Sequence, residues 1–179
     1  IPASRRLAGA EVHLAREPGG NGILRQALAG LPHGRWDMVL LDCPPTLGQL
    51  SVAALTAATH VLIPVEATIG ASRALPQILK TIQSMRTRVN PGLEIVGLAL
   101  IRVEPTRHAR EIAALLDRRF EELLLPQVIR KTVRLQDAQL YSQPITVYDP
   151  HSSGADDYRA LTSAVLDRLP MAAAVGSGT

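Results

Sequence analysis

The sequence predicts an α/β fold, with a mostly parallel sheet and helices on both of its faces. Short apolar runs alternate along the whole chain with segments of helical periodicity, which is the order of right-handed β-α-β units. The apolar runs are also nearly continuous, as expected of parallel strands buried on both faces. No internal repeat or second domain is visible, so residues 1–169 are predicted to form one domain.

In the first half of the chain, turn residues separate the elements. A run of Pro and Gly divides an N-terminal helix from a second, short helix, and the run Asn90-Pro91-Gly92 ends a long helix with regular apolar spacing. Two apolar runs between these breaks read as buried strands. Helices are expected at about 7–14, 23–29, 47–58 and 72–89, and strands at 36–42 and 60–65.

The second half continues the alternation. The run L-E-I-V-G-L-A-L-I reads as a third strand, and the apolar spacing of the following segments is helical. Strands are expected at 93–101, 123–129 and 145–148, and helices at 107–120, 132–141 and 154–169. Residues 170–179 are small and polar and are expected to be a disordered tail.

Composition indicates a folded protein outside the membrane. Of the 179 residues 46% are hydrophobic, and no apolar run is long enough to span a bilayer. The N-terminus lacks the apolar region of a secretory signal. It begins with Ile, which suggests a fragment, a processed product or an incomplete record. The single cysteine, Cys43, excludes an intrachain disulfide, so the expected location is cytoplasmic.

The charge balance is basic but does not by itself identify a partner. The formal net charge is +3, and the cations are 17 Arg and only 2 Lys. Arginine suits phosphate because its planar fork donates hydrogen bonds in pairs. A genome rich in Arg codons explains the same bias, so a DNA partner needs further support.

The stretch V-L-L-D-C-P-P-T-L-G is the most informative motif of the chain. It reads as a buried strand that delivers Asp42 to the edge where α/β proteins bind ligands. An aspartate there typically holds Mg²⁺ through water, as the Walker-B residue of nucleotide hydrolases. A helix cap or a structural salt bridge is the plainer alternative. The partner motif, G-x-x-x-x-G-K-[ST], is absent from this sequence.

The residues around Asp42 fit a ligand loop. Pro44 and Pro45 make the turn rigid, and Gly48 either allows close backbone approach or starts a helix. We expect Cys43 to be a packed core thiol. Glu66 follows the second strand at the same edge and either contacts a nucleotide or lies on the surface.

A second candidate region is the basic segment I-R-K-T-V-R-L-Q-D at 129–137. It would face a nucleotide base or a phosphate backbone, although a solvated charged face is the commoner explanation. Arg159 and Arg168 on the last helix have the same two interpretations.

Several blocks of the sequence resemble one protein family. The run from W-D-M-V-L-L-D-C-P-P to V-L-I-P-V-E-A, the start I-P-A-S-R-R-L-A-G-A-E-V-H-L, and the later S-Q-P-I-T-V-Y-D-P and S-S-G-A-D-D-Y-R-A-L occur in this order. Together they resemble the ParA/Soj-type partitioning ATPases over about residues 1–169. The resemblance places the chain in the C-terminal part of a P-loop NTPase-like domain, without the P-loop strand.

The resemblance implies an ATPase of the deviant Walker type that dimerises around ATP and Mg²⁺. It also implies non-specific DNA binding, association with the nucleoid, and a ParB-like partner that moves plasmid or chromosome cargo. Asp42 corresponds to the Walker-B aspartate. Arg130 and Thr132 fall in the segment near the adenine, where the family usually has Pro and Asn. Lys131, Arg134, Arg159 and Arg168 are the candidate DNA contacts, of which Arg134 matches an arginine implicated in the family.

Departures from the family keep two alternatives open. The Walker-A loop and the second aspartate motif are missing, so the chain alone is predicted not to hydrolyse ATP. The first alternative to a partitioning ATPase is a non-catalytic module that interacts with DNA or protein. A MinD-type ATPase is disfavoured because the tail is not a basic amphipathic membrane helix. An in-frame K-G-G-x-G-K-[ST] loop upstream would decide for the enzyme.

Overall fold

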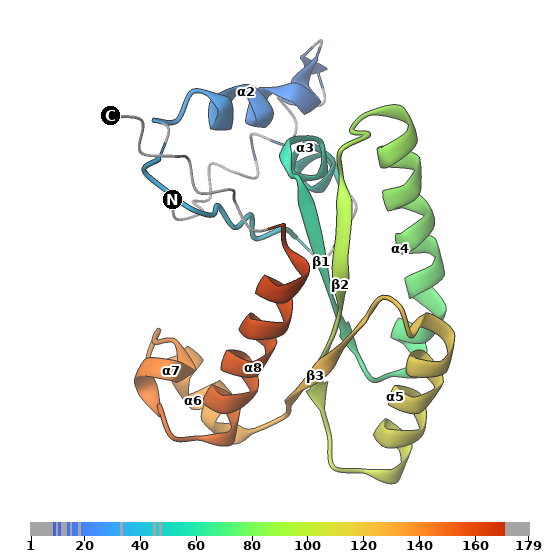
Figure 1. Ribbon diagram of the computed structural model, residues 1–179, viewed down its shortest axis with the longest axis vertical. Coiled ribbons are helices and arrows are strands. Elements are labelled where there is room, and N and C mark those ends of the chain that lie inside the picture. Colours follow the sequence, from blue (N-terminus) through green and yellow to red (C-terminus); the bar gives the residue numbers. More distant parts are fainter. Residues whose placement is uncertain are drawn as a thin grey trace. The chain divides into compact units, whose positions relative to one another are not determined.

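The computed structural model in Figure 1 describes residues 9, 11, 14, 16, 17, 19–32, 34–44, 46 and 48–170. Its contacts divide the chain into two compact units, Ile1–Val61 with Ile78–Glu94 and Leu62–Gln77 with Ile95–Thr179. Most of the helix expected near the N-terminus and the tail after residue 170 lie outside the described residues. That residues 1–169 form a single domain stays a prediction.

Three strands form one sheet in the order β1-β2-β3: β1 (His60–Glu66), β2 (Glu94–Val103) and β3 (Leu124–Arg130). Strands β2 and β3 run parallel, with Leu98 opposite Leu124. These strands coincide with three predicted apolar runs to within two residues, because each run can be buried on both faces. The predicted α/β class is therefore confirmed.

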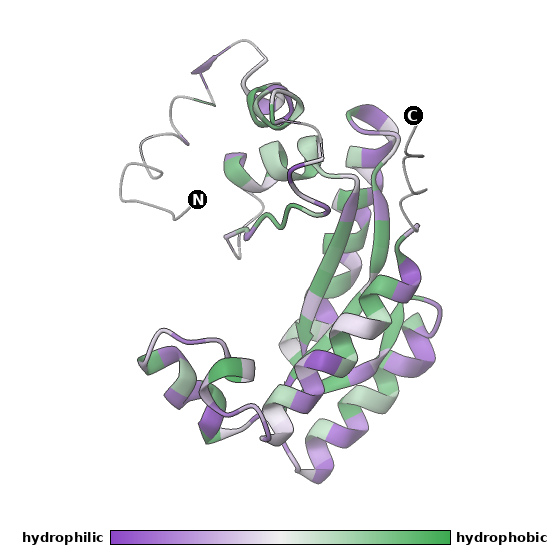
Figure 2. Cartoon of the chain, turned by 60° about the vertical axis from the view of Figure 1, so that its left-hand side comes forward, coloured by the Kyte–Doolittle hydropathy of each residue, from purple (hydrophilic) through white to green (hydrophobic). Residues whose placement is uncertain are grey.

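Helices connect and cover the strands. Helix α4 (Ile69–Arg88) links β1 to β2, and α5 (Arg107–Phe120) links β2 to β3. Helix α8 (Ser153–Arg168) packs against β3, and Figure 1 shows α5 on the other side of that strand. The core beneath α8 contains Ala99, Leu125, Ile129 and Leu161. In Figure 2 the strands are largely apolar, while polar residues mark the outward sides of the helices.

A smaller core joins α8 to two short helices, α6 (Val133–Leu140) and α7 (Ile145–Tyr148). The strand predicted at 145–148 is wrong. Pro144 at the helix start has a φ of −61°, which favours a helical turn, and its carbonyl oxygen accepts from the amides of Val147 and Tyr148. Ile145 is buried against Ala155 in this small core, so its burial does not depend on a place in the sheet.

The other unit contains a 3-10 turn (Gly20–Gly22), α2 (Ile23–Ala29) and α3 (Gln49–Ala57). The side chain of Asn90 donates to the carbonyl oxygens of Leu55 at 2.9 Å and Ala58 at 2.7 Å, which holds the end of α3. The strand predicted at 36–42 is wrong: described residues 36–44 have no regular structure. Trp36 is 61% exposed and Leu40 85%, because an apolar run forms a strand only where a neighbouring strand pairs with it.

Candidate functional site

The carboxyl ends of β1, β2 and β3 line a hollow of about 290 Å³. Its walls come from the residue after or at the end of each strand and from the start of α5, namely Glu66, Thr68, Arg102, Glu104, Thr106, His108 and Lys131. In open α/β sheets ligands bind outside the carboxyl ends of the strands. The hollow is therefore the position in this unit where a ligand is expected.

Two ion pairs cross this hollow. Arg102 Nη1 lies 3.3 Å from Glu66 Oε1, and Lys131 Nζ lies 2.5 Å from Glu104 Oε1. The hydrogen bond from Lys131 and its positive charge lower the pKa of Glu104 below its usual value. Arg102 has a φ of +53°, a left-handed conformation that non-glycine residues rarely adopt and that often occurs at ligand sites.

A second hollow adjoins the first, since both are lined by Glu104, Thr106 and Lys131. The side-chain oxygen of Thr106 accepts from the amide of Ala109 at 3.2 Å and begins α5. Thr132 caps α6 in the same way, accepting from Leu135 at 3.3 Å. Two capped helix starts therefore face this part of the sheet edge, and the Thr132 hydroxyl already has a structural role.

Arg130, predicted near the adenine, forms the most extensive ion pair of the described residues. Its guanidinium donates to Asp157 at 2.7 to 3.2 Å, and its backbone amide donates to Asp157 Oδ2 at 3.0 Å. Burial raises the pKa of Asp157, but the hydrogen bonds and charge of Arg130 outweigh it and leave that pKa below its usual value. The same pair raises the pKa of Arg130. Arg130 thus joins β3 to the first turn of α8.

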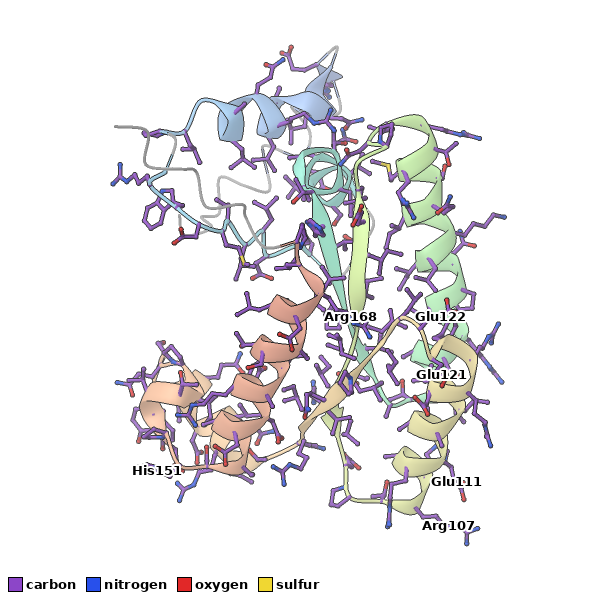
Figure 3. All side chains as sticks on the ribbon, in the orientation of Figure 1. Arg107, Glu111, Glu121, Glu122, His151 and Arg168 are labelled. Carbon is purple, nitrogen blue, oxygen red and sulfur yellow. The ribbon has the colours of Figure 1, made fainter. Side chains whose placement is uncertain are left out.

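The four residues predicted to contact DNA have different surroundings. Lys131 pairs with Glu104, and Arg159 pairs with Asp156 at 3.1 Å. Arg134 lies 3.4 Å from a carboxylate oxygen of Asp149 and 4.0 Å from one of Asp137. Arg168 points toward the strands (Figure 3) and donates to the carbonyl oxygens of Val96, Leu123 and Leu124 at 2.9 to 3.1 Å. The first three are exposed ion-paired cations, whereas Arg168 holds α8 on the sheet.

Asp42 lies in the irregular segment of the other unit and is exposed. Within the described residues it has no hydrogen bond or ion pair, so neither the cap nor the salt-bridge alternative is observed there. Pro44 is exposed beside it, and Pro45 is outside the described residues. Cys43, expected in the core, is also exposed; partial burial of its sulfur and the charge of Asp42 raise the pKa of its thiol.

Gly48 precedes the first turn of α3 and has no side-chain cap. A carboxylate oxygen of Glu11 accepts from the amide of Gln49 at 3.1 Å, and a Cβ on Gly48 would lie 2.5 Å from that oxygen. The glycine both starts the helix and leaves room for a carboxylate close to the first amide of α3, and its role toward a nucleotide stays a prediction.

The structure groups only some of the predicted residues. Lys131 and Thr132 share one hollow, while Asp42 and Gly48 belong to the other unit. Sequence reasoning named Glu66 as a possible ligand contact but missed Arg102, Glu104 and Thr106. The available signal was their position: each polar residue follows an apolar strand at its carboxyl end.

Comparison with known proteins identifies the family. A family model described as an AAA domain matches residues 1–95, just over half of the chain. The protein Soj of Bacillus subtilis, named a sporulation initiation inhibitor, is 34% identical over 92% of this chain and 65% of its own length. The chain belongs to the ParA/Soj-type family of AAA-domain proteins.

Two further relatives match more than nine tenths of this chain. An uncharacterized protein of Mycobacterium tuberculosis is 37% identical over 96% of this chain and 54% of its own length. A Mycobacterium smegmatis structure named cobyrinic acid a,c-diamide synthase, with bound ATP analog and magnesium, is 33% identical. It covers 93% of this chain and 61% of that one, with a TM-score of 0.75. The chain thus spans between 54% and 65% of the length of these three relatives.

Two kinds of feature are absent from the described residues. No three His, Cys, Asp or Glu side chains gather there into a metal-binding group. No helix in the same residues is both long and apolar enough to cross a membrane.

Proposed function

We propose that the protein to which this chain belongs is a ParA-type ATPase of plasmid or chromosome partitioning. It dimerises around ATP and Mg²⁺, binds DNA without sequence preference, and is stimulated by a ParB-like protein. The observation that carries the proposal is the similarity to Soj along nine tenths of this chain. The charged hollow at the carboxyl edge of the sheet supports a ligand on this side of the fold.

Asp42 suits a magnesium site that is completed by the nucleotide. It is a single, exposed carboxylate without a protein partner among the described residues. Mg²⁺ keeps several waters and is commonly held by one or two carboxylates together with substrate phosphates, so one carboxylate suffices. When bound, the ion neutralises charge on the phosphates during hydrolysis. Asp42 would orient it through water, and Pro44 and Pro45 would limit the movement of Asp42.

Candidate contacts for the rest of the nucleotide are backbone amides and side chains that the family resemblance points to. The amide of Gln49 at the start of α3, beside Gly48, already donates to one carboxylate and can donate to a phosphate oxygen instead. Arg130 and Thr132 supply the segment next to the base. Because Arg130 is paired with Asp157, its guanidinium serves this segment by fixing the backbone, and only its aliphatic part is free to contact a ring.

We propose that three exposed cations contact DNA, namely Lys131, Arg134 and Arg159. Each is exposed but paired with a carboxylate, so each must exchange that partner for a phosphate. Exposed pairs contribute only about 0–1 kcal/mol, so the exchange is energetically accessible. Arg168 is the weakest member of the predicted set, since three carbonyl oxygens already occupy its donors.

The ATPase proposal is tested by Asp42→Ala in a protein that carries this chain together with a Gly-rich phosphate loop. Loss of the Mg²⁺-orienting carboxylate should lower ATP hydrolysis roughly a hundredfold or more. Asp37→Ala, at an exposed aspartate of the same irregular segment, is the matched control and should hydrolyse ATP normally. Near-normal turnover in Asp42→Ala would refute the metal assignment.

A non-catalytic module that binds DNA or protein is the second candidate, because the exposed cations Lys131, Arg134 and Arg159 would serve it equally well. Phosphoryl transfer depends on positioning and charge neutralisation, so the purified 179-residue chain should release no phosphate from ATP. If the loop-carrying protein is also inactive but binds DNA, the module is the better description.

A further inference from the structure

Helix α4 differs from the other basic parts of the chain in having no acidic residue. It carries Arg73, Lys80, Arg86 and Arg88 along Ile69–Arg88 and no Asp or Glu. Three of these cations, Lys80, Arg86 and Arg88, lie in its last turns within one compact unit and are called the α4 basic segment below. Within the described residues, no hydrogen bond or ion pair is formed by the side chain of any of the three.

Packing fixes which side of this segment is free. Ile82 and Met85 are 2% and 8% exposed and lie in the core. Lys80, Ser84 and Arg88 are exposed and Arg86 is half-buried. Because residues three, four and seven apart share one face of a helix, Lys80, Ser84 and Arg88 follow one another along the outer side.

A role at the helix terminus explains only part of this charge. Arg86 and Arg88 lie in the last turn, where cations interact favourably with the helix dipole. Lys80 lies two turns earlier, beyond the reach of that effect. It is also one of only two lysines in an arginine-rich chain, so the arginine bias does not account for it.

We infer that the α4 basic segment is a second contact surface for the phosphate backbone of duplex DNA. Eight residues of helix place Lys80 and Arg88 about 12 Å apart along the axis, close to the width of a major groove at about 12 Å, so both can meet phosphates across one groove. The side chains between them, Gln83, Ser84 and Thr87, are polar and exposed, as on phosphate-contacting faces. An anionic membrane is disfavoured because this face lacks large apolar residues for insertion.

The inference rests on the proposed function in one respect, namely that the anionic ligand of the α4 basic segment is DNA. The test compares the 179-residue chain with Lys80→Gln/Arg88→Gln on a 30-base-pair duplex of arbitrary sequence, by fluorescence anisotropy at several salt concentrations. Two lost phosphate contacts should weaken binding at least about tenfold at low salt and reduce the salt slope by about two units. The effect should be equal on unrelated duplexes.

Two further variants separate the contact from general charge and folding. Arg107→Gln/Arg110→Gln on α5 removes the same charge from guanidiniums that already bond to Glu111 and to the carbonyl oxygen of Thr106, and should bind nearly as the parent does. The charge-keeping Lys80→Arg/Arg88→Lys should also bind like the parent, which excludes misfolding of α4 as the cause.

Each outcome decides the inference. If the parent binds DNA and Lys80→Gln/Arg88→Gln keeps its affinity and slope, the α4 surface is wrong while DNA binding stands. If the α5 variant weakens equally, only net charge matters and the inference fails. If Lys80→Gln/Arg88→Gln loses binding to phosphatidylserine vesicles but keeps its binding to DNA, the surface contacts a membrane and the inference is also overturned. If the 179-residue chain binds no duplex, the same variants are compared in the loop-carrying protein with ATP and Mg²⁺. Absence of duplex binding there as well refutes the proposed DNA function together with the α4 surface.

Discussion

Two basic regions of this protein carry similar charge but differ in what surrounds it. The five Arg and Lys side chains from Arg130 onward all bond to carboxylates or carbonyl oxygens. The α4 basic segment has no such partner among the described residues. A local cluster of positive charge in the sequence therefore does not measure free charge, because a neutralising carboxylate can come from a residue 27 positions away, as Asp157 and Glu104 do.

The paired region itself contains three kinds of cation. Arg168 donates to three carbonyl oxygens and acts as a clamp. Arg130 forms a two-pronged pair with Asp157, whose side chain is only 11% exposed. Lys131, Arg134 and Arg159 form exposed pairs of the kind that contribute little to stability. Variants of each kind test whether this ranking is right.

The clamp should have the largest effect on stability. Arg168→Ala leaves the end of α8 unattached and should lower the free energy of unfolding by about 2 kcal/mol, because charged hydrogen bonds to three carbonyls are lost. Arg168→Lys should recover little, since a single ammonium cannot replace the planar fork. Urea denaturation measures both, and wild-type stability in Arg168→Ala would show that the clamp is dispensable.

The same clamp can be approached from the strand. A Cβ at Gly97 would lie 2.9 Å from Arg168 Nη1, from the Leu123 carbonyl oxygen and from Leu125 Cγ. Gly97→Ala should therefore displace the guanidinium and cost about 1–3 kcal/mol of folding free energy. In the Arg168→Ala background the cost should be smaller, which a double-mutant cycle detects.

The Arg130–Asp157 pair should give a smaller effect that depends on pH. The pKa of Asp157 lies below its ordinary value of 3.8, so its stabilisation is fully present above that value and is lost as pH falls through the folded-state pKa. Asp157→Asn should cost about 1 kcal/mol at pH 7 and progressively less as the pH falls below 3.8. Thermal melts of parent and variant from pH 7 into the acidic range measure this difference in stability. If stability falls with acid equally in both, Asp157 does not contribute to the acid sensitivity.

Much of the fold followed from the sequence because local pattern and burial agree there. Strands β1 to β3 are apolar runs with neighbours on the sheet, and α5 has the predicted bounds. The apolar run at 36–42 has the same pattern but no pairing strand, and the segment at 145–148 follows a proline that starts a helix. Pairing and packing are decided by residues distant in sequence, which periodicity does not report.

The sequence predicts the candidate residues that belong to a motif but not the residues that pair with them in the folded chain. Asp42, Gly48 and Thr132 stand out by their place in a motif. The partners Glu104 and Asp157 do not, since each lies beside its cation only after β2 or α8 has docked. Whether the named residues bind ATP, Mg²⁺ or DNA stays a prediction.

Freeing a paired cation should strengthen DNA binding modestly. Glu104→Gln removes the carboxylate 2.5 Å from Lys131 and should raise the affinity for an arbitrary duplex about threefold at low salt. Glu111→Gln, which removes the same charge from α5, is the control for net charge and should change affinity less. Equal gains in the two variants would mean that pairing of Lys131 does not limit contact.

The smallest effect is expected at an exposed pair outside both basic regions. Arg107 and Glu111 extend from the start of α5 in Figure 3 and bond at 2.8 Å, with side chains 91% and 60% exposed. Water screens such a pair, and holding two long side chains together costs entropy, so Arg107→Gln should change unfolding free energy by less than about 0.5 kcal/mol. Urea denaturation and duplex titration should both overlay the parent. A clear loss of DNA affinity in this variant would mean that a paired, distant cation contributes as much as the α4 basic segment, and the contrast between the two regions would then have no consequence for binding.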